Sequence, residues 1–410
     1  MSVEKLVSLL SEKLTALEHK GALKGSEMVI TGVKPAEGER GSRFFIEGYG
    51  EKEFIRMNSN SYLGMSLRKE VIEAEEQTAR KYGAGPGAVR FISGTYKPHV
   101  ELEKKLAAFH HRESAMIFSS AYAAVMGTVS PLIDNETVVL SDELNHNCII
   151  NAIRLSRPAV KEVYKHLSMG DLEAKLANAV GKGKRVLLIT DGIFSMRGDY
   201  APLDVISEIA GKYDSEFEGG VTTIVDDSHG VGAFGETGRG TEEYTGAEGI
   251  DIIIATLGKS LGVNGGYLAA NGTVINFLRE TAPFYIYSNP ITPAEASAAI
   301  KAIEILDSAK GKELLRHLRI LTKRFEKGLT ELGYEIIASE HPVVPLMIRD
   351  THSTADLVRY LTQHGILATG LNYPVVPRGD EEIRFQVSAD HTEYDIDCVL
   401  RVLNEFKEKL

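Results

Sequence analysis

The sequence predicts an α/β protein with a mostly parallel central sheet and a smaller α+β domain at the C-terminus. From about residue 60, amphipathic helical segments alternate with short apolar strands, as in βαβ units. Three apolar strands stand out, at 185–190, 222–227 and 251–256. After about residue 290 the pattern changes to long helices followed by isolated short strands, which is typical of an α+β domain.

Composition and charge limit the class of protein. The chain has 410 residues, of which 43% are hydrophobic and 25% are charged, as in a globular protein with a large core. Its 46 Lys and Arg against 57 Asp and Glu give a net charge of -11 without any basic run, so no nucleic-acid partner is expected. Cys148 and Cys398, the only cysteines, suit a reducing compartment and provide neither a disulfide framework nor a zinc site. We expect a cytoplasmic protein without a metal.

The first 55 residues are expected to form an N-terminal arm. The segment 3–20 has leucines at helical spacing interrupted by glutamates, which predicts an amphipathic helix rather than a signal or transit peptide. A candidate pair of strands follows around 44–50 and 52–58. The longest uncharged stretch, 114–133, contains serines, a glycine and a proline, so it predicts a strand, a turn and a buried helix rather than an integral membrane segment.

The rest of the chain divides into two expected domains. Residues 56–290 form a large α/β domain, in which 202–214 predicts a helix with Pro202 in its first turn. Residues 291–410 form the small α+β domain. Its clearest segments are helices at 294–310 and 313–333 and a strand at 343–350, followed by a further helix and a last strand that ends with 382–388.

Polar residues stand at the ends of the three clear strands. Asp226, Ser228 and His229 stand at the end of one strand, Asp191 and Ser195 follow the strand before it, and Lys259 follows the strand after it. Because ligands of open α/β sheets bind at the carboxyl ends of the strands, we expect these side chains to share one site. A lysine can form a Schiff base with an aldehyde, a carboxylate can keep a pyridine nitrogen protonated, and a histidine can hold a phenolic oxygen. These groups meet the requirements of pyridoxal 5′-phosphate (PLP).

Simpler interpretations exist for the same residues. Lys259 alone is typical of a solvated loop lysine and His229 of a structural histidine, but the ordered set, DxxH and then Gly-Lys one strand later, favours the cofactor. The glycines of 230–235 form a GxGxxG pattern like that of dinucleotide sites. Such a site requires a strand that turns directly into a helix, whereas ETGRGTEEY follows here, so a loop is expected.

An ordered series of motifs covers nearly the whole chain beyond the arm. VDDSHGVGAFGETGRG is followed by TLGKSLGVNGGY, and the other motifs are NSNSYLG (58–64), GAGPGAVRFISGT (83–95), HVELEKKLAAF (99–109), SDELNHNCII (141–150), DGIFSMRGD (191–199) and YPVVPRGDEEIRFQVSADHT (373–392). This series resembles the α-oxoamine synthases, fold-type I PLP enzymes that condense an amino acid with an acyl-CoA. The resemblance implies a PLP-dependent acyltransferase of that fold.

The resemblance also implies roles for individual residues. Lys259 would bind PLP as a Schiff base and move the α-proton of the substrate. Asp226 would pair with the pyridine nitrogen, and His229 would bind the phenolic oxygen, with Ser195 close by. His146 would stack on the cofactor ring and orient the acyl-CoA carbonyl, although alone it would be typical of a helix-cap histidine.

The phosphate of the cofactor would lie at a helix N-terminus. The resemblance places it on the backbone N–H groups of Ser120, Ala121 and Tyr122, where the helix dipole and unpaired donors favour an anion. Thr256 would add a hydroxyl group.

The remaining implied residues concern the substrate and a second subunit. Arg384 would bind the amino-acid carboxylate with help from Asn60, because the guanidinium offers two parallel donors. A surface charge paired with neighbouring glutamates is the alternative for Arg384. Ser288 and Asn289 would reach the phosphate of the neighbouring subunit, so the resemblance implies a homodimer with shared active sites.

The motifs leave the substrates partly open. YPVVPRG, TLGKSLG and YIYSNP are most similar to family members that join glycine to acetyl-CoA and retain the carboxylate, whereas decarboxylating members share the same core. Pro86, Val89 and the SSAY segment depart from common family choices and leave the acyl chain open. Aminotransferases and decarboxylases of the same fold need not carry SDELNH. A non-catalytic partner subunit would lack the lysine that is present here.

Overall fold

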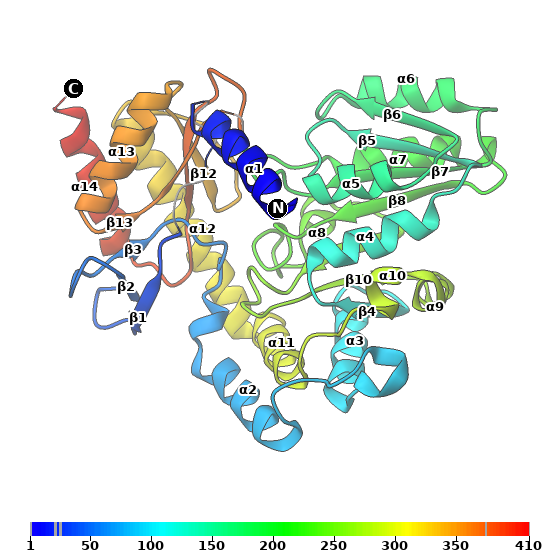
Figure 1. Cartoon of the computed structure of the whole chain (residues 1–410), viewed down its shortest axis with the longest axis horizontal. Coiled ribbons are helices and arrows are strands. Elements are labelled where there is room, and N and C mark those ends of the chain that lie inside the picture. Colours follow the sequence, from blue (N-terminus) through cyan, green and yellow to red (C-terminus); the bar gives the residue numbers. More distant parts are fainter. Residues whose placement is uncertain (1, 20–22, 24–26, 374, 410) are drawn as a thin grey trace.

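The computed structural model describes residues 2–19, 23, 27–373 and 375–409. These residues form a larger part around a seven-stranded sheet and a smaller part around a four-stranded sheet, which lie side by side in Figure 1. The predicted fold class, an α/β protein with a smaller α+β part, is confirmed. Within the described ranges, no helix has both the length and the apolar character needed to span a membrane.

The seven-stranded sheet is mixed and mostly parallel. Its strand order is β4-β10-β9-β8-β7-β5-β6, and only β10 runs antiparallel to its two neighbours. The strands are Ser114–Phe118 (β4), Thr137–Asp142 (β5), Val160–Tyr164 (β6), Arg185–Asp191 (β7), Val221–Asp226 (β8), Ile252–Thr256 (β9) and Gly266–Ala270 (β10). The three strands that stood out in the sequence are therefore the adjacent strands β7, β8 and β9, and their carboxyl ends meet at one edge.

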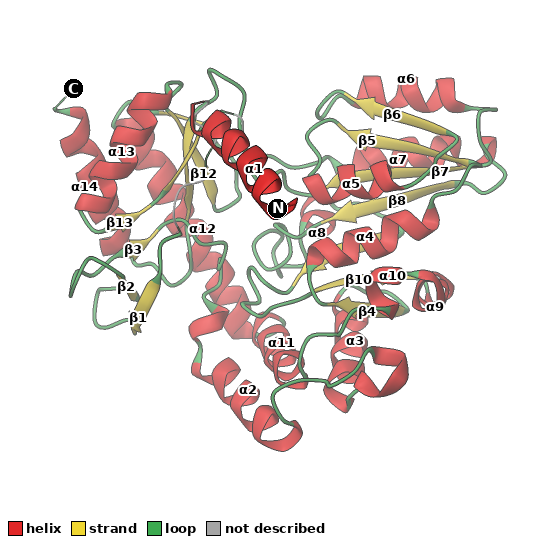
Figure 2. Cartoon of the chain, viewed as in Figure 1, coloured by secondary structure: helices red, strands yellow, loops and turns green. Residues whose placement is uncertain are grey.

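Helices cover both faces of this sheet, as Figure 2 shows. Alternate residues of β7 explain why its sequence is apolar throughout: Leu187 and Ile189 pack in the cluster of α4 and α5, whereas Val186 and Leu188 pack in the cluster of α6 and α7. The helices and short turns of this part are α2 (Lys69–Tyr82), α3 (Lys97–Phe109), α4 (Ala121–Leu132), α5 (Asn147–Leu155), α6 (Met169–Ala179), α7 (Leu203–Tyr213), α8 (Thr241–Thr245), α9 (Gly272–Thr281), α10 (Pro283–Ile286), the 3₁₀ turns Met65–Leu67 and Asp214–Glu216, and the π turn Arg90–Gly94. Pro202 is the N-cap of α7, and the GxGxxG segment forms the predicted loop.

The smaller part is an antiparallel sheet with helices. Its strand order is β11-β12-β15-β14. The strands are Glu335–Ile336 (β11), Val343–Met347 (β12), Thr369–Leu371 (β14) and Glu382–Gln386 (β15), and the helices are α11 (Pro293–Leu306), α12 (Ala309–Glu331), α13 (Thr351–Gln363) and α14 (Glu393–Lys407). Helix α11 packs on α2 and α3 of the larger part, and α12 continues to the small sheet. The domain boundary near residue 290 stays a prediction, and Pro374 of YPVVPRG lies outside the described residues.

The N-terminal segment joins the smaller part. Helix α1 (Ser2–His19) forms as predicted and lies between the two parts in Figure 1, with its leucines exposed. Strand β1 (Ile30–Lys34) pairs with β2 (Arg43–Ile46), and β3 (Ile55–Arg56) pairs in parallel with β13 (Ile366–Leu367). The expected strand pair over 44–50 and 52–58 is therefore wrong except for a single bridge between Phe44 and Phe54, because each segment has a more extensive partner elsewhere.

Candidate active site

A cavity at the carboxyl ends of β7, β8 and β9 collects most of the predicted site residues. Its lining consists of Ala121, Tyr122, His146, Cys148, Asp191, Ile193, Ser195, Asp226, Ser228, His229 and Lys259. The parallel register of β7 and β8 sets Asp191 directly beside Asp226. The topology thus brings together groups from five separate segments of the chain.

Lys259 lies in the loop between β9 and β10, partly buried beside two carboxylates. Burial lowers the pKa of its amine to about 8, and Asp226 and Asp191 act in the opposite direction. An amine with this pKa is neutral in an appreciable fraction near neutral pH, and the neutral form is the nucleophile and the base. The loop itself is fixed by Thr256, whose hydroxyl accepts a hydrogen bond from the N–H of Gly258 at 3.0 Å.

The two adjacent aspartates at the end of β8 have different surroundings. Asp227 is buried, and its two carboxylate oxygens accept hydrogen bonds from the N–H and the hydroxyl of Thr241 at 2.7 and 2.6 Å. Burial raises the pKa of Asp227 to about 6. Asp226 instead lines the cavity, where Oδ1 accepts from the N–H of Ser228 at 3.1 Å and Oδ2 lies 3.7 Å from Cys148 Sγ. Asp227 fixes the following loop, and Asp226 is available to a ligand.

His146 is the N-cap of α5 and also faces the cavity. Its backbone N–H donates to Asp191 Oδ2 at 2.8 Å, and its Nδ1 accepts from the N–H of Cys148 at 3.3 Å and lies 2.9 Å from the sulfur. Burial lowers the pKa of His146, which favours the neutral ring. Because Nδ1 accepts a backbone hydrogen bond, the ring proton is assigned to Nε2.

His229 is held on two sides. Its Nδ1 lies 2.8 Å from the hydroxyl oxygen of Tyr62, and its carbonyl accepts from Nε2 of His341 at 2.9 Å. Burial, together with the charge of Lys259, lowers the pKa of His229 well below its ordinary value, so the ring is neutral. The adjacent hydroxyl of Ser228 is buried and has no hydrogen-bond partner within the described ranges.

The N-terminus of α4 forms an anion cradle at the same cavity. Ser120 is the N-cap and accepts from the N–H of Ala123 at 3.0 Å. In the described part of the chain, the N–H groups of Ala121 and Tyr122 have no partner, as is usual for the first turn of a helix. A Cβ at Gly266 would lie 2.3 Å from the nitrogen of Ala121, so only glycine permits this approach.

Comparison with known proteins agrees with this geometry. The aminotransferase class I and II family matches residues 52–403. The mitochondrial 2-amino-3-ketobutyrate coenzyme A ligase of Bos taurus is 40% identical over 401 residues, 97% of this chain and 91% of the relative. The 8-amino-7-oxononanoate synthase of Thermosipho melanesiensis is 36% identical over 404 residues, 98% of each chain. A solved serine palmitoyltransferase variant from S. paucimobilis, with bound PLP–myriocin, has a TM-score of 0.87 at 26% identity and covers 99% of this chain and 98% of that chain.

The chain belongs to the α-oxoamine synthase family. It is therefore an enzyme, a PLP-dependent acyltransferase of fold type I, as the motifs predicted. The cavity of this α-oxoamine synthase fits PLP: a lysine amine for the aldehyde, a carboxylate for the ring nitrogen, an imidazole for the phenolic oxygen and a helix N-terminus for the phosphate. The unpartnered hydroxyl of Ser228 offers one more polar contact in the same cavity.

Six predicted site residues of the α-oxoamine synthase are not in the lining of this cavity: Asn60, Ser120, Thr256, Ser288, Asn289 and Arg384. Arg384, on β15, donates from Nη2 to Asn60 Oδ1 at 3.3 Å. The same Asn60 oxygen contacts the hydroxyl of Tyr62, which lies 2.8 Å from Nδ1 of the cavity residue His229, so Arg384 lies near the cavity. Ser288 and Asn289 follow α10 and do not line the cavity of their own chain. All the predicted roles at this site remain predictions.

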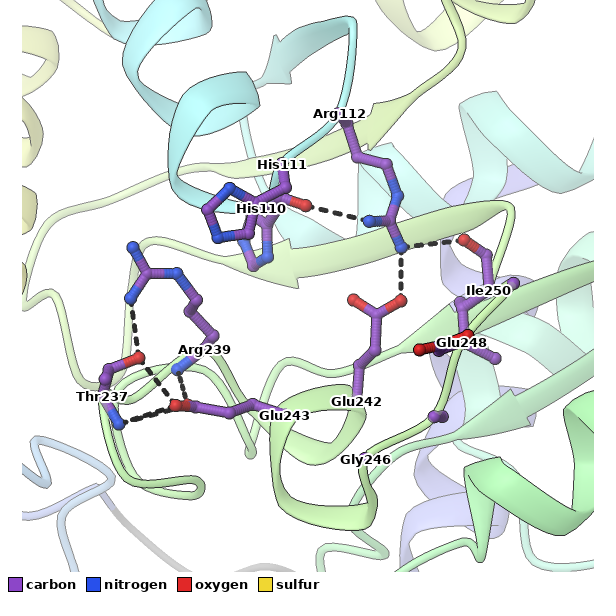
Figure 3. A pocket seen from close by; sticks show the side chains of 12 residues that line it. His110, His111, Arg112, Thr237, Arg239, Glu242, Glu243, Gly246, Glu248 and Ile250 are labelled. Carbon is purple, nitrogen blue, oxygen red and sulfur yellow. Dashed lines mark hydrogen bonds and ion pairs between the residues drawn. The ribbon is translucent and has the colours of Figure 1, made fainter.

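A much larger cavity, about 770 Å³, lies between the end of α3 and α8 and is drawn in Figure 3. Its lining residues bond to one another: Arg112 donates to Glu242 and to the carbonyl of Ile250, and the backbone N–H of Arg239 donates to Glu243. The cavity at Lys259 is only about 70 Å³, but Lys259, Asp226, His146 and His229 line it. Cavity volume therefore does not locate the chemistry of this protein.

The sequence placed Asp191 and Ser228 after two of the clear strands, and the structure brings both to the cavity. Sequence reasoning missed two residues that contact the site, Cys148 and Tyr62. Cys148 stands within a predicted motif, but no pattern indicates its contacts. Tyr62 gives no local signal, since its partner His229 is 167 residues away in the chain.

Proposed function

We propose that this α-oxoamine synthase condenses glycine with acetyl-CoA, retains the carboxylate and releases free CoA. The observation that carries the proposal is the grouping of Lys259, Asp226, His229 and His146 at one cavity, with Arg384 near it. The choice of substrates rests on the motifs and on the 40% identity to 2-amino-3-ketobutyrate coenzyme A ligase.

In this proposal Lys259 has two tasks. It would hold PLP covalently, and its amine would later accept the proton that the α-carbon of glycine loses and pass it to the departing CoA sulfur. PLP, when bound, supplies a protonated ring that takes up the electron pair left on the α-carbon. Asp226 holds the proton on the ring nitrogen, because a buried carboxylate stabilises an adjacent positive charge. His229 donates to the phenolic oxygen.

The substrates are oriented by three further side chains. Arg384 binds the carboxylate of glycine, and Asn60 accepts the remaining guanidinium hydrogen bond. His146 donates from Nε2 to the thioester carbonyl of acetyl-CoA, which makes the carbonyl carbon more electrophilic. The α-carbon forms the new C–C bond, the C–S bond breaks, and CoA leaves as the thiol.

A decarboxylating synthase is the second candidate. The 36% identity to 8-amino-7-oxononanoate synthase, over almost the whole of both chains, favours it nearly as much. Synthases of the 5-aminolevulinate and serine palmitoyltransferase types would share the same residues and differ in acyl chain, amino acid and loss of CO2. An aminotransferase is a third alternative, and it would transfer the amino group without consuming an acyl-CoA.

The proposal includes the quaternary state and the location. A homodimer would bring Ser288 and Asn289 to the phosphate of the partner's cofactor, and it would cover the exposed leucines of α1. The cytoplasm is proposed as the compartment because both cysteines are free thiols.

A panel of substrates tests the proposal. Glycine, L-alanine and L-serine are each combined with acetyl-CoA, longer acyl-CoAs and a dicarboxylic acyl-CoA, and the released thiol and CO2 are measured. We expect glycine with short acyl-CoAs to react best without CO2, and longer chains to react more slowly, since one methylene changes binding by only about 1 kcal/mol. Equimolar CO2, or a preference for L-alanine or L-serine, would favour the decarboxylating alternative. Absence of thiol release with every pair would reject acyl-CoA condensation.

A further inference from the structure

A buried tyrosine connects the two ends of the proposed site. The hydroxyl oxygen of Tyr62 lies 2.8 Å from His229 Nδ1 and 3.3 Å from Asn60 Oδ1. The same Asn60 oxygen accepts from Arg384 at 3.3 Å. Tyr62 is fully buried, and its ring packs edge-to-face on His341 with centroids 5.2 Å apart. The hydroxyl therefore has a fixed position between the residue proposed for the cofactor oxygen and the pair proposed for the substrate carboxylate.

The position of one proton decides what His229 can do. A tyrosine hydroxyl has a single proton, which either His229 Nδ1 at 2.8 Å or Asn60 Oδ1 at 3.3 Å can accept. Because Asn60 Oδ1 already accepts from Arg384, we assign the proton to His229 Nδ1. The neutral ring of His229 then carries its own proton on Nε2. That nitrogen has no hydrogen-bond partner in the part of the chain that the structure describes, and His229 lines the cavity of Lys259.

We propose that Tyr62 is a positioning residue that keeps His229 protonated on Nε2, as a donor toward the phenolic oxygen of the cofactor. The proposal rests on the proposed function, since it takes the cofactor role of His229 as given. The opposite arrangement, in which Nδ1–H donates to Tyr62 and Tyr62 donates to Asn60, would turn a nitrogen lone pair toward that oxygen. Two hydrogen-bond acceptors, His229 Nε2 and the phenolic oxygen, would then face each other. Tyr62 therefore determines whether the contact between these two atoms is attractive or repulsive.

The first test replaces the hydroxyl and retains the ring. Tyr62→Phe keeps the packing on His341, and Tyr267→Phe is a matched control, because Tyr267 is also fully buried and its hydroxyl lies 2.7 Å from His110 Nε2 outside the cavity. Both variants and the unmodified enzyme are saturated with PLP, and visible absorption is recorded against pH. Without its donor, the phenolic oxygen holds the proton of the Lys259-bound cofactor more strongly. We expect the pH midpoint of the absorbance change to rise by about one unit in Tyr62→Phe and to stay unchanged in Tyr267→Phe. The size follows because a hydrogen bond to a charged oxygen changes a protonation equilibrium about tenfold.

The second test needs no substitution at Tyr62. Histidine labelled with ¹⁵N is incorporated into the unmodified enzyme, and the spectrum of His229→Gln identifies the signals of His229. We expect an unprotonated Nδ1 and a protonated Nε2 in the PLP-saturated enzyme. A protonated Nδ1, or equal midpoint shifts in Tyr62→Phe and Tyr267→Phe, would overturn the role of Tyr62. If the unmodified enzyme bound no PLP, the proposed function itself would fail, which distinguishes the two failures.

Discussion

The pKa of Lys259 gives a test at the scale of a single residue. Burial lowers that pKa from 10.5 to about 8. Only the neutral amine attacks an aldehyde, so in cofactor-free protein the rate of PLP attachment should rise about tenfold per pH unit below pH 8 and level off above it. Stopped-flow absorbance measures this rate. Lys259→Ala should show no absorbance change from PLP attachment. If the rate levelled off only near pH 10.5, the burial assigned to the amine would be contradicted.

The adjacent aspartates give a second test at this scale. Asp226→Asn should keep the fold and lose most α-proton exchange with glycine, because an amide does not hold the proton of a pyridine nitrogen. Asp227→Asn should instead lower the free energy of unfolding by about 1–3 kcal/mol, since its new N–H2 group faces the donors of Thr241. Exchange of deuterium into glycine and urea unfolding separate the two effects. Normal exchange in Asp226→Asn would reject its proposed role.

The residues that sequence alone identified share one property. Asp226, His229 and Lys259 stand at the ends of strands whose apolar character makes them recognisable, and the parallel topology then brings them together. Tyr62 could not be found in this way, because its contact with His229 joins two segments that are 167 residues apart in the chain. His146 was given two alternative interpretations, and its geometry satisfies both, as a helix cap and as a residue of the cavity.

At the scale of elements, a buried ion pair joins the N-terminal segment to α14. Asp395 is fully buried and accepts from Arg43 and from the N–H of Gly41 at 2.9 Å. Asp395→Ala should lower the free energy of unfolding by about 3–5 kcal/mol, because it leaves the Arg43 charge buried without a partner. The matched control is Asp397→Ala on the same helix, which removes an exposed pair with Arg324 and should cost at most about 1 kcal/mol. Urea unfolding measures both, and equal losses would contradict the argument.

Elements were predictable where their signals are local. The helices predicted at 294–310 and 313–333 show helical periodicity, strands β7, β8 and β9 are short apolar runs, and the structure confirms all five. Helix α14 was not predicted. The pairing of β3 was not predictable, because its partner β13 begins 311 residues later than β3 and both strands are two residues long. A short strand of this kind is defined by its partner rather than by its own sequence.

At the scale of the whole molecule, the proposed dimer predicts complementation. Lys259→Ala chains lack the reactive amine, and chains with Ser288→Ala and Asn289→Ala lack the groups proposed to reach the partner's phosphate. Each parent should be nearly inactive, whereas mixed chains should recover part of the thiol release through hybrid dimers with one intact site. Light scattering gives the mass of the active species. A fully active, PLP-saturated monomer would contradict shared active sites.

The parallel pairing of β3 with β13 has a consequence for the order in which the protein is made. The strands of the seven-stranded sheet all lie between residues 114 and 270, so that sheet can assemble while translation continues. Strand β3 instead needs β13, which begins at residue 366, and Arg43 needs Asp395 of α14. The N-terminal segment therefore lacks these partners until almost the entire chain has been synthesised. A chaperone that shields its apolar residues would have to stay bound for most of that time.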